Sequence, residues 1–476
     1  MLLFALLAAS LSTAGVARAE GRPAYGGSAE GALAASPLTL DPLSPALGDE
    51  EVSALVFDTL FRWGADGRPA PNLALGLDET PAVPSLIGAP LTSPRARVHL
   101  RTDVRFSDGQ PLTARDVAAS LTRALASPRG WMLGPIRSAR ALSGDTVELE
   151  LSRTAPDLAL LLATPAASVT PGGLPPGAHP IGSGPFVVSS IARDPEGATV
   201  RLAESPTCFS GRPYLDALTL RALSARAETT RLETGALALA RHASSGFPGA
   251  TRRPVALDAS APTLTLYLAF GRALPDDEAQ ALRAALDLGL DRARLVRQVR
   301  EPARPALSAA PPALGGVEHP IAHDPLAARA QLVAKYPALS LALLIDRSRP
   351  SDRALAFRLL VELGHLGVTL SLDEVDAGTF ARRAATGDYQ LLLGTSAPPA
   401  PSGGLAELAL WAAVDPQAAR AQLARAPAQV GAVDLSRTRV LPLVHRGTRL
   451  QRAPELRGVA VDQAGRIDWP SVHWHR

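Results

Sequence analysis

The order of apolar and polar positions predicts alternating strands and helices in the second half of the chain. The apolar run at residues 263–270 (TLTLYLAF) predicts a strand, and helices are predicted at 276–288 and 291–299 with Asp291 as an N-cap. Further on, the pattern predicts helices at 325–334, 351–366 and 377–386, and strands at 339–345, 368–372, 389–393 and 440–443. This alternation indicates βαβ units and a mixed or parallel sheet.

The first half of the chain predicts shorter elements. A short strand at 38–40 is expected to run into a turn at 41–45, followed by a helix whose apolar positions recur between Val52 and Trp63. Asp49 is expected to cap this helix, and the two glutamates after it suit the positive end of the helix dipole. Later strands are predicted at 146–151, 186–189 and 217–222, and a helix that Gly235 ends.

The stretch from Phe106 to Val117 (FSDGQPLTARDV) carries two acidic residues close together. Ser107–Gly109 has the composition of a tight turn in which Gly109 takes a positive φ. Thr113 precedes Asp116 by three residues, close to a capping box, and an apolar helical stripe follows. Turn and cap chemistry therefore explain both acids, and a catalytic carboxylate pair is disfavoured.

The chain begins with an apolar run at residues 2–16 that is too short for a comfortable membrane span. It ends in Ala17-Arg18-Ala19, a small-x-small pattern typical of signal-peptide cleavage after Ala19. No cysteine lies near that point, so a lipoprotein is not supported, and the protein is expected in the periplasm. A buried N-terminal helix remains the alternative, since no basic residue precedes the run.

Composition excludes several kinds of chemistry. The 476 residues carry 48 basic and 45 acidic side chains, a balance that argues against nucleic-acid binding. Lys335 is the only lysine, which restricts Schiff-base and P-loop chemistry. Cys208 is the only cysteine, so neither an intramolecular disulfide nor a cysteine-based metal site is possible.

No motif predicts a catalytic residue, a metal site or a cofactor. The sequence lacks a His-Glu-x-x-His pair and a nucleophile elbow. Gly182-Ser183-Gly184 precedes a predicted strand, so it does not form a phosphate-binding loop at a helix start. His473 and His475 fit either a metal pair or a frayed terminus, and Cys208 either an inert or a reactive thiol.

The Phe106–Val117 block resembles the signature of the bacterial extracellular solute-binding proteins of family 5, the peptide-, dipeptide- and nickel-binding components of ABC importers. Other pieces that resemble this family follow in the family's order. They are Leu40-Asp41-Pro42, Pro71–Ala74, Gly182–Phe186, Gly211–Asp216, Arg283 with Asp291-Arg292, Gly367–Leu372, Gly387–Tyr389 and Pro442-Leu443.

The resemblance implies an α/β, two-lobed periplasmic-binding-protein (Venus-flytrap) fold. Mixed sheets flanked by helices would form two lobes, with the ligand cleft between them. Lobe I is expected at 20–254 and 437–476 and lobe II at 255–436, and a Pro/Gly/Arg-rich break at 247–254 independently fits this limit.

The resemblance also implies a function and its partners. A monomer would capture a small solute, peptide-like or another organic molecule, by hinge closure and deliver it to an inner-membrane ABC permease. Two alternatives stay open. One is a degenerate paralogue that acts as a sensor or interaction module, and the other is an enzyme on the same scaffold.

The expected ligand site lies where the ends of strands from the two lobes meet across the cleft. Thr39, Leu40 and Asp41 are predicted to face Thr395, Ser396 and Ala397. The loop at 394–401 contains no acid and no aromatic residue, whereas in peptide-binding members the corresponding loop meets the ligand's amino terminus. A neutral site that holds its ligand by hydrogen bonds is therefore expected.

Overall fold

The computed structural model describes residues 23–81, 93–241 and 254–475, except 65, 195, 196, 428, 430, 432 and 463. The predicted signal peptide and its cleavage site lie outside these residues, as does nearly all of the break at 247–254. Within the described ranges, no helix has the length and apolar character needed to cross a membrane.

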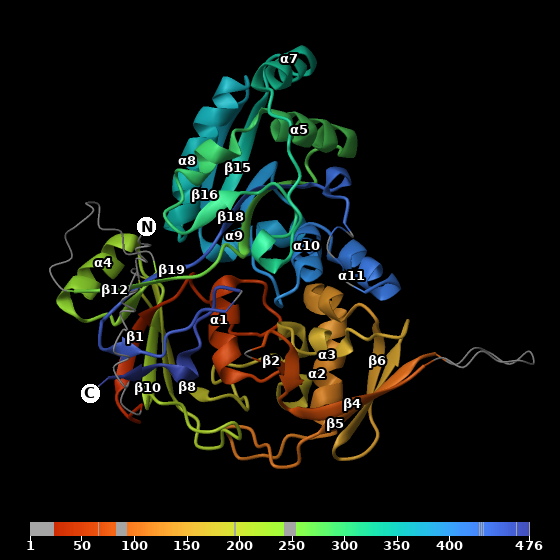
Figure 1. Ribbon diagram of the computed structural model, residues 1–476, viewed down its shortest axis with the longest axis vertical. Coiled ribbons are helices and arrows are strands. Elements are labelled where there is room, and N and C mark those ends of the chain that lie inside the picture. The colour runs from red at the N-terminus through yellow and green to blue at the C-terminus, as the bar shows by residue number, and fades with distance from the viewer. Residues whose placement is uncertain are drawn as a thin grey trace, which may run out of the picture.

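The lower part of the molecule in Figure 1 is built on a sheet with strand order β12-β19-β11-β1-β10-β9-β8. Strand β1 is parallel to β10 and β11, so segments distant in sequence form the centre of this sheet. Its strands are β1 (Ser28–Ala32), β8 (Phe186–Asp194), β9 (Gly197–Glu204), β10 (Ala217–Arg221), β11 (Leu239–Ala240), β12 (Ala256–Ala259) and β19 (Arg449–Arg452). Two helices accompany it, α1 (Leu47–Val56) and α4 (Ala225–Thr234).

A smaller antiparallel sheet, ordered β4-β5-β7-β6, completes this lobe. Its strands are β4 (Ala74–Thr80), β5 (Arg95–Leu100), β6 (Ile136–Ala141) and β7 (Thr146–Leu151), and α2 (Ala114–Ala126), η1 (Pro128–Leu133) and α3 (Leu158–Leu161) accompany it. The predicted capping box forms, because Asp116 accepts the backbone N–H of Thr113 at 2.9 Å. Gly109 takes a φ of +86° in the predicted turn. The Phe106–Val117 block therefore builds the fold, as expected.

The upper part of Figure 1 contains the second large sheet, ordered β14-β18-β13-β17-β15-β16. Its strands are β13 (Leu264–Phe270), β14 (Ala303–Pro305), β15 (Ser340–Asp346), β16 (Thr369–Val375), β17 (Leu391–Ser396) and β18 (Val440–Arg446). The accompanying helices are α5 (Asp276–Gly289), α6 (Arg292–Val296), α7 (Pro325–Lys335), α8 (Pro350–His365), α9 (Ala377–Thr386), α10 (Gly403–Ala412) and α11 (Pro416–Arg425). Apart from β14, which was not predicted, these strands and α5–α9 match the predicted order of elements.

Alternate residues of β13 face two different cores. Leu266 and Leu268 pack in the core that contains α5 and α8, whereas Tyr267 and Ala269 pack in the core that contains α10 and α11. That second core also contains the helices of the smaller first-lobe sheet, such as Leu121 of α2. The lobes therefore share one apolar core through α10 and α11, which lie between them in Figure 1.

The chain passes between the two large sheets twice. It leaves the first sheet after β12 and enters the second at β13, and it returns between β18 and β19. The lobe limits predicted at 254/255 and 436/437 precede these changes of sheet, so β12 and β18 lie in the sheet opposite to the one expected. Each limit that the resemblance implies therefore lies one strand before the crossing itself.

Two local predictions in the first half of the chain are wrong. Residues 38–40 do not form a strand, because Leu40 has a φ of +56°, outside the extended region. The helix that begins at Leu47 ends at Val56, and Phe61–Trp63 forms β2, which pairs with β3 (Pro69–Pro71). The apolar positions between Val52 and Trp63, predicted to lie on one helix, therefore belong to a helix and a strand. The remaining short elements are η2 (Pro165–Ala167), η3 (Pro171–Gly173), η4 (Pro312–Leu314), η5 (Leu435–Arg437), β20 (Leu456–Arg457), η6 (Trp469–Ser471) and β21 (His473–Trp474).

Candidate functional site

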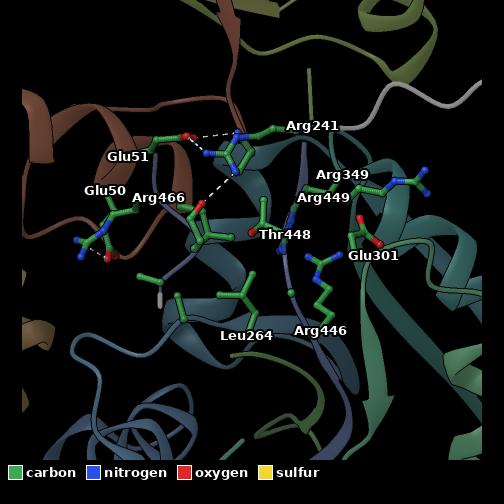
Figure 2. A pocket seen from close by; sticks show the side chains of 16 residues that line it. Glu50, Glu51, Arg241, Leu264, Glu301, Arg349, Arg446, Thr448, Arg449 and Arg466 are labelled. Carbon is green, nitrogen blue, oxygen red and sulfur yellow. Dashed lines mark hydrogen bonds and ion pairs between the residues drawn. The ribbon is translucent and has the colours of Figure 1, made fainter. Parts of the chain in front are cut away.

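A cavity of about 60 Å³ lies where the two lobes meet. The first lobe contributes Ala34, Leu47, Glu50, Glu51, Arg241, Gly447, Thr448, Arg449, Ala464, Gly465 and Arg466, and the second lobe contributes Leu264, Glu301, Arg349, Ala397 and Arg446. We call this cavity the inter-lobe pocket. Figure 2 shows the glutamates of α1 on one side of it and Glu301 with Arg446 on the other.

The first-lobe wall rests on acids of helix α1. Glu51 forms a buried ion pair with Arg241 and accepts the backbone N–H of Ala34 at 3.0 Å. Glu50 forms ion pairs with Arg129 of η1 and with Arg466, the latter at 3.6 Å. Burial alone would raise the pKa of Glu50, but the guanidinium groups of Arg129 and Arg466 outweigh burial and hold this pKa below its ordinary value. The lowered pKa keeps Glu50 charged, and both glutamates hold arginines of the first lobe.

Asp49, the preceding residue, holds the loop where a strand was predicted. Its Oδ1 accepts the backbone N–H groups of Leu38, Thr39 and Leu40 at 2.7, 2.9 and 2.8 Å. Its Oδ2 accepts the hydroxyl of Ser44 at 2.6 Å. The prediction that Asp49 caps its own helix is therefore wrong. Asp49 instead holds the preceding loop against the start of the helix.

The second-lobe wall contains two arginines around one buried acid. Asp352, only 1% exposed, forms ion pairs with Arg349 at 3.0 Å and with Arg446 at 3.6 Å. Arg446 also donates to the hydroxyl of Thr395 at 3.3 Å. The Nη2 atom of Arg349 is buried and makes no hydrogen bond within the described part of the chain. This nitrogen is a donor that a ligand or a water molecule could satisfy.

The predicted site residues are not all at this pocket. Ala397 lines the pocket. Thr395 does not line it, but its hydroxyl accepts a hydrogen bond from Arg446, which does. Thr39 is exposed and Leu40 is buried in the first-lobe core. Asp41 caps its turn and forms an ion pair with Arg123 at 2.8 Å. Ser396 lies at the end of β17, paired with Thr265, and is not among the lining residues. Ligand contact by these residues stays a prediction.

The inter-lobe pocket is charged, unlike the neutral site predicted at Thr39–Asp41 and Thr395–Ala397, because five arginines and three glutamates line it. The charged side chains come from separate segments rather than from the loop at 394–401. The only local sign of a charged site in the sequence was the run Asp49-Glu50-Glu51. All three acids are buried, and a favourable interaction with the helix dipole does not by itself require burial.

Three further side chains with possible chemistry, His445, Cys208 and His473, are not among the residues that line the pocket. His445, in β18, is fully buried, and its Nδ1 lies 3.0 Å from the hydroxyl of Thr265; burial lowers its pKa to about 4. Cys208 is half-buried, and its sulfur lies 3.2 Å from the hydroxyl of Ser210. The ring of His473 lies tilted by 56° against that of Tyr214, with ring centroids 5.3 Å apart. Within the described residues, no group of three or more histidine, cysteine or acidic side chains is placed to hold a metal ion.

The sequence matches a known family over most of its length. The model of the bacterial extracellular solute-binding proteins, family 5, matches residues 94–410. The chain belongs to this family. The matched range begins just before β5 and ends in α10, so it contains strands of both lobes and the Phe106–Val117 block.

Curated relatives of this family 5 protein match it over shorter stretches. An uncharacterized protein YhjP of Bacillus subtilis is 32% identical over 37% of the chain and 29% of its own length. A probable di/tripeptide-binding protein 5 of Pseudomonas aeruginosa is 28% identical over 45% of the chain and 42% of its own length. The chain thus matches less than half of the length of each of these relatives.

Solved structures share the fold of this family 5 protein over nearly its whole length. A dipeptide-binding protein of Pseudoalteromonas sp. SM9913 in complex with Met-Leu superposes with a TM-score of 0.76 at 17% identity, covering 94% of this chain and 100% of its own. The oligopeptide-binding protein AppA of B. subtilis, in complex with a nonapeptide, gives a TM-score of 0.74 at 15% identity, covering 96% and 100%. The PBP AgaA of A. tumefaciens R10, in complex with agropinic acid, gives 0.74 at 18% identity, covering 94% and 99%. The two-lobed periplasmic-binding-protein fold is thereby confirmed.

Proposed function

We propose that this family 5 protein is exported, captures a small charged solute in the inter-lobe pocket and delivers it to an ABC permease of the inner membrane. The observation that carries the proposal is the pocket itself, because its charged walls come from both lobes. A solute that touches both walls favours the closed arrangement of the lobes through its differential affinity for that arrangement. Binding and transfer require no chemical step, in keeping with the family.

The charge of the pocket supports a solute that carries an anionic group. The lining residues comprise five arginines against three glutamates. Glu51 forms an ion pair with Arg241, and Glu50 forms ion pairs with both Arg129 and Arg466. Among the described residues the Nη2 of Arg349 has no hydrogen-bond partner, and a guanidinium is well suited to a carboxylate or phosphate oxygen.

The size of the pocket supports a small solute. The cavity has a volume of about 60 Å³ in this arrangement of the lobes. A long peptide does not fit unless the lobes move apart. The family resemblance allows peptides as a class, and the pocket volume favours the smallest of them or other organic ions of that size.

Native mass spectrometry of protein purified from the periplasm tests the proposal. The expected result is a bound solute that dissociates on mild denaturation and raises the melting temperature when it is added back. Small-angle scattering should show a smaller radius of gyration with this solute than without it. A protein that carries no solute, and whose melting temperature responds to none of a broad set of small organic ions, would overturn the proposal.

Two variants separate pocket binding from general electrostatics. Arg349→Ala should weaken solute binding about tenfold or more, because it removes a charge-assisted donor. Arg347→Ala is the matched control, because Arg347 is exposed and is not among the residues that line the pocket. Equal losses in the two variants would indicate long-range steering instead of contact.

A further inference from the structure

A second cavity, of about 160 Å³, lies within the second lobe. Its walls come from α9, from β15 and β16, and from the segments that follow β13 and precede β17. We call this cavity the distal pocket. The residues that line it are Ala273, Ala342, Leu344, Asp373, Arg383, Asp388, Tyr389 and Gln390.

The distal pocket is separate from the inter-lobe pocket. Leu264 begins β13 and lines the inter-lobe pocket, whereas Ala273, just beyond the end of β13, lines the distal pocket. Strand β17 runs the opposite way, and Gln390 before it lines the distal pocket whereas Ala397 after it lines the inter-lobe pocket. A seven-residue strand such as β13 spans about 20 Å. The two pockets therefore lie at opposite ends of the second-lobe sheet.

The distal pocket lies where the sheet loses main-chain pairing. Strand β15 pairs with β17 at only two residues, Leu343 and Leu344. At the next position the side-chain Oε1 of Gln390 accepts the backbone N–H of Ala342 at 2.7 Å. Ala342 and Leu344 lie two residues apart on the strand, so their side chains share one face and give the pocket an apolar wall.

The charged groups of the distal pocket already bind one another. Arg383 donates through Nη1 to Oδ2 of Asp373 at 2.6 Å and through Nε to the backbone carbonyl of Asp388 at 2.9 Å. The carboxylate of Asp388 lies 3.6 Å from the same Nε, but its side chain is 77% exposed, so water screens its charge. An ionic ligand would therefore find no strong counter-charge free inside the pocket.

The groups that remain free are neutral. Tyr389 is only 6% exposed, and its hydroxyl makes no hydrogen bond within the described part of the chain. Burial raises the pKa of this hydroxyl to about 12, so at neutral pH it keeps its proton and can both donate and accept. The Nε2 of Gln390 likewise has no acceptor among the described residues. Polar groups at this depth normally have partners, and a bound ligand would supply them.

The size of the distal pocket limits the ligand to a single ring. A protein cavity of about 150 Å³ accommodates benzene, so the distal pocket has room for one six-membered ring. Hydroxyl groups on such a ring can donate to the carboxylate of Asp373 and accept from Tyr389 and Gln390, because each hydroxyl is both donor and acceptor. The C–H groups of the ring would then pack on the apolar wall.

We propose that the distal pocket is a second binding site, which holds a single polyhydroxylated ring such as a monosaccharide. The inference does not rest on the proposed function, because no residue of the inter-lobe pocket takes part in it. The protein would thereby bind two different small molecules, one at each end of the second-lobe sheet.

Titrations followed by NMR test the ligand class, with D-glucose, D-galactose, D-mannose and myo-inositol as the compounds added. Wild-type protein should bind at least one of them with a Kd of about 1 mM or tighter, the range expected for a ligand of about 12 non-hydrogen atoms. Cyclohexanol keeps the ring but has one hydroxyl, and it should bind at least about tenfold more weakly. Binding of none of the four polyols would overturn the inference, as would equal binding of cyclohexanol.

Tyr389→Phe tests the site itself. The hydroxyl that it removes has no partner in the described chain, so the melting temperature should not fall, whereas polyol binding should weaken about three- to tenfold. Tyr336→Phe is the matched control, because the hydroxyl of Tyr336 is also buried without a partner among the described residues and does not line the pocket. It should bind the polyol as wild type does. Equal affinities of wild type and Tyr389→Phe would overturn the assignment.

Arg349→Ala separates the two pockets, because Arg349 lines only the inter-lobe pocket. This variant should bind the polyol as tightly as wild type. Polyol binding that Arg349→Ala abolishes and Tyr389→Phe leaves unchanged would place the ring in the inter-lobe pocket. That result would overturn the distal site and leave solute capture intact, whereas a protein that captures no solute in the inter-lobe pocket could still bind the ring at the distal one.

Discussion

Gly134 and Leu423 meet where the second lobe packs on the first, so closely that a Cβ atom on Gly134 would lie 2.7 Å from the Cβ of Leu423. Leu423 belongs to α11, and Gly134 follows η1 directly. Hydrogen bonds surround this point. Arg420 donates to the carbonyl of Leu125 at 2.7 Å, and Ser152 donates to that of Ala424 at 2.9 Å. This contact joins the two lobes through residues that do not belong to the strands by which the chain crosses between them.

Gly134→Ala is expected to destabilise the protein by about 1–3 kcal/mol, the usual cost of an overpacked core position. The added methyl group would also approach the backbone of α11, since Ala424 N and Arg420 O each lie 3.0 Å from the Cβ position. Urea denaturation measures the change in the free energy of unfolding. Gly144→Ala is the control, because no described residue beyond its chain neighbours lies within 4 Å of its Cβ position. Equal free energies of unfolding for the two variants would show that α11 moves aside for the added methyl group without loss of stability.

Gly109→Val is expected to destabilise the protein by about 1–3 kcal/mol through backbone conformation alone. Gly109 has a φ of +86°, which a β-branched residue adopts poorly, and no described residue beyond its chain neighbours lies within 4 Å of its Cβ position. Thermal denaturation measures the loss. Gly109→Asn should lose less, because asparagine tolerates the left-handed region better than valine. A Gly109→Val protein with an unchanged melting temperature but weakened solute binding would contradict the structural role of this turn.

Local sequence patterns predicted most of the helices and strands. Such a pattern depends on only the one or two layers that the element packs against. The strand at β13 follows from an apolar run, and the start of α2 from Thr113 and Asp116, both of which are local features. The helices α10 and α11 were not predicted. Helix α10 lies between two apolar layers, so most of its residues are buried and the polar face that marks a surface helix is missing.

The candidate site was less predictable because its residues come together only through the tertiary fold. Glu301, Arg349 and Arg446 lie on three different segments of the second lobe, and no fixed spacing joins them. Ala397 was identified through the family resemblance, which gives the position of a cleft but not its charge. The burial of Glu50 and Glu51 depends on Arg129 and Arg241, which lie far away in the sequence.

Asp49→Ala is expected to destabilise the protein by about 3 kcal/mol or more, because several donors lose their acceptor and each buried unpaired group costs about 1–3 kcal/mol. The backbone N–H groups of Leu38, Thr39 and Leu40 all bind Asp49. The left-handed backbone of Leu40 would also lose its support. Urea denaturation measures the change. Asp277→Ala is the control, because Asp277 is exposed in the first turn of α5. A loss no larger than that of the control would mean that the loop is held by other contacts.

His445 is expected to make the protein less stable as the pH falls from about 6.5 to about 4. Burial lowers its pKa from 6.5 to about 4, so the folded protein keeps the ring neutral while the unfolded chain takes up a proton in this range. Stability therefore rises with pH across this window, by roughly 3 kcal/mol in total for this one group. Urea denaturation at a series of pH values measures the slope.

His445→Asn removes the titrating group and keeps a polar atom that can meet the hydroxyl of Thr265, which lies 3.0 Å from the Nδ1 of His445. This variant should lose about one proton's worth of slope between pH 4 and 6.5, even if its stability at pH 7 is lower. His319→Gln is the control, because His319 is exposed, and it should keep the wild-type slope. Parallel pH profiles for wild type and His445→Asn would mean that His445 takes up its proton equally in the folded and unfolded states, and that its burial between β13 and β14 does not exclude the charged ring.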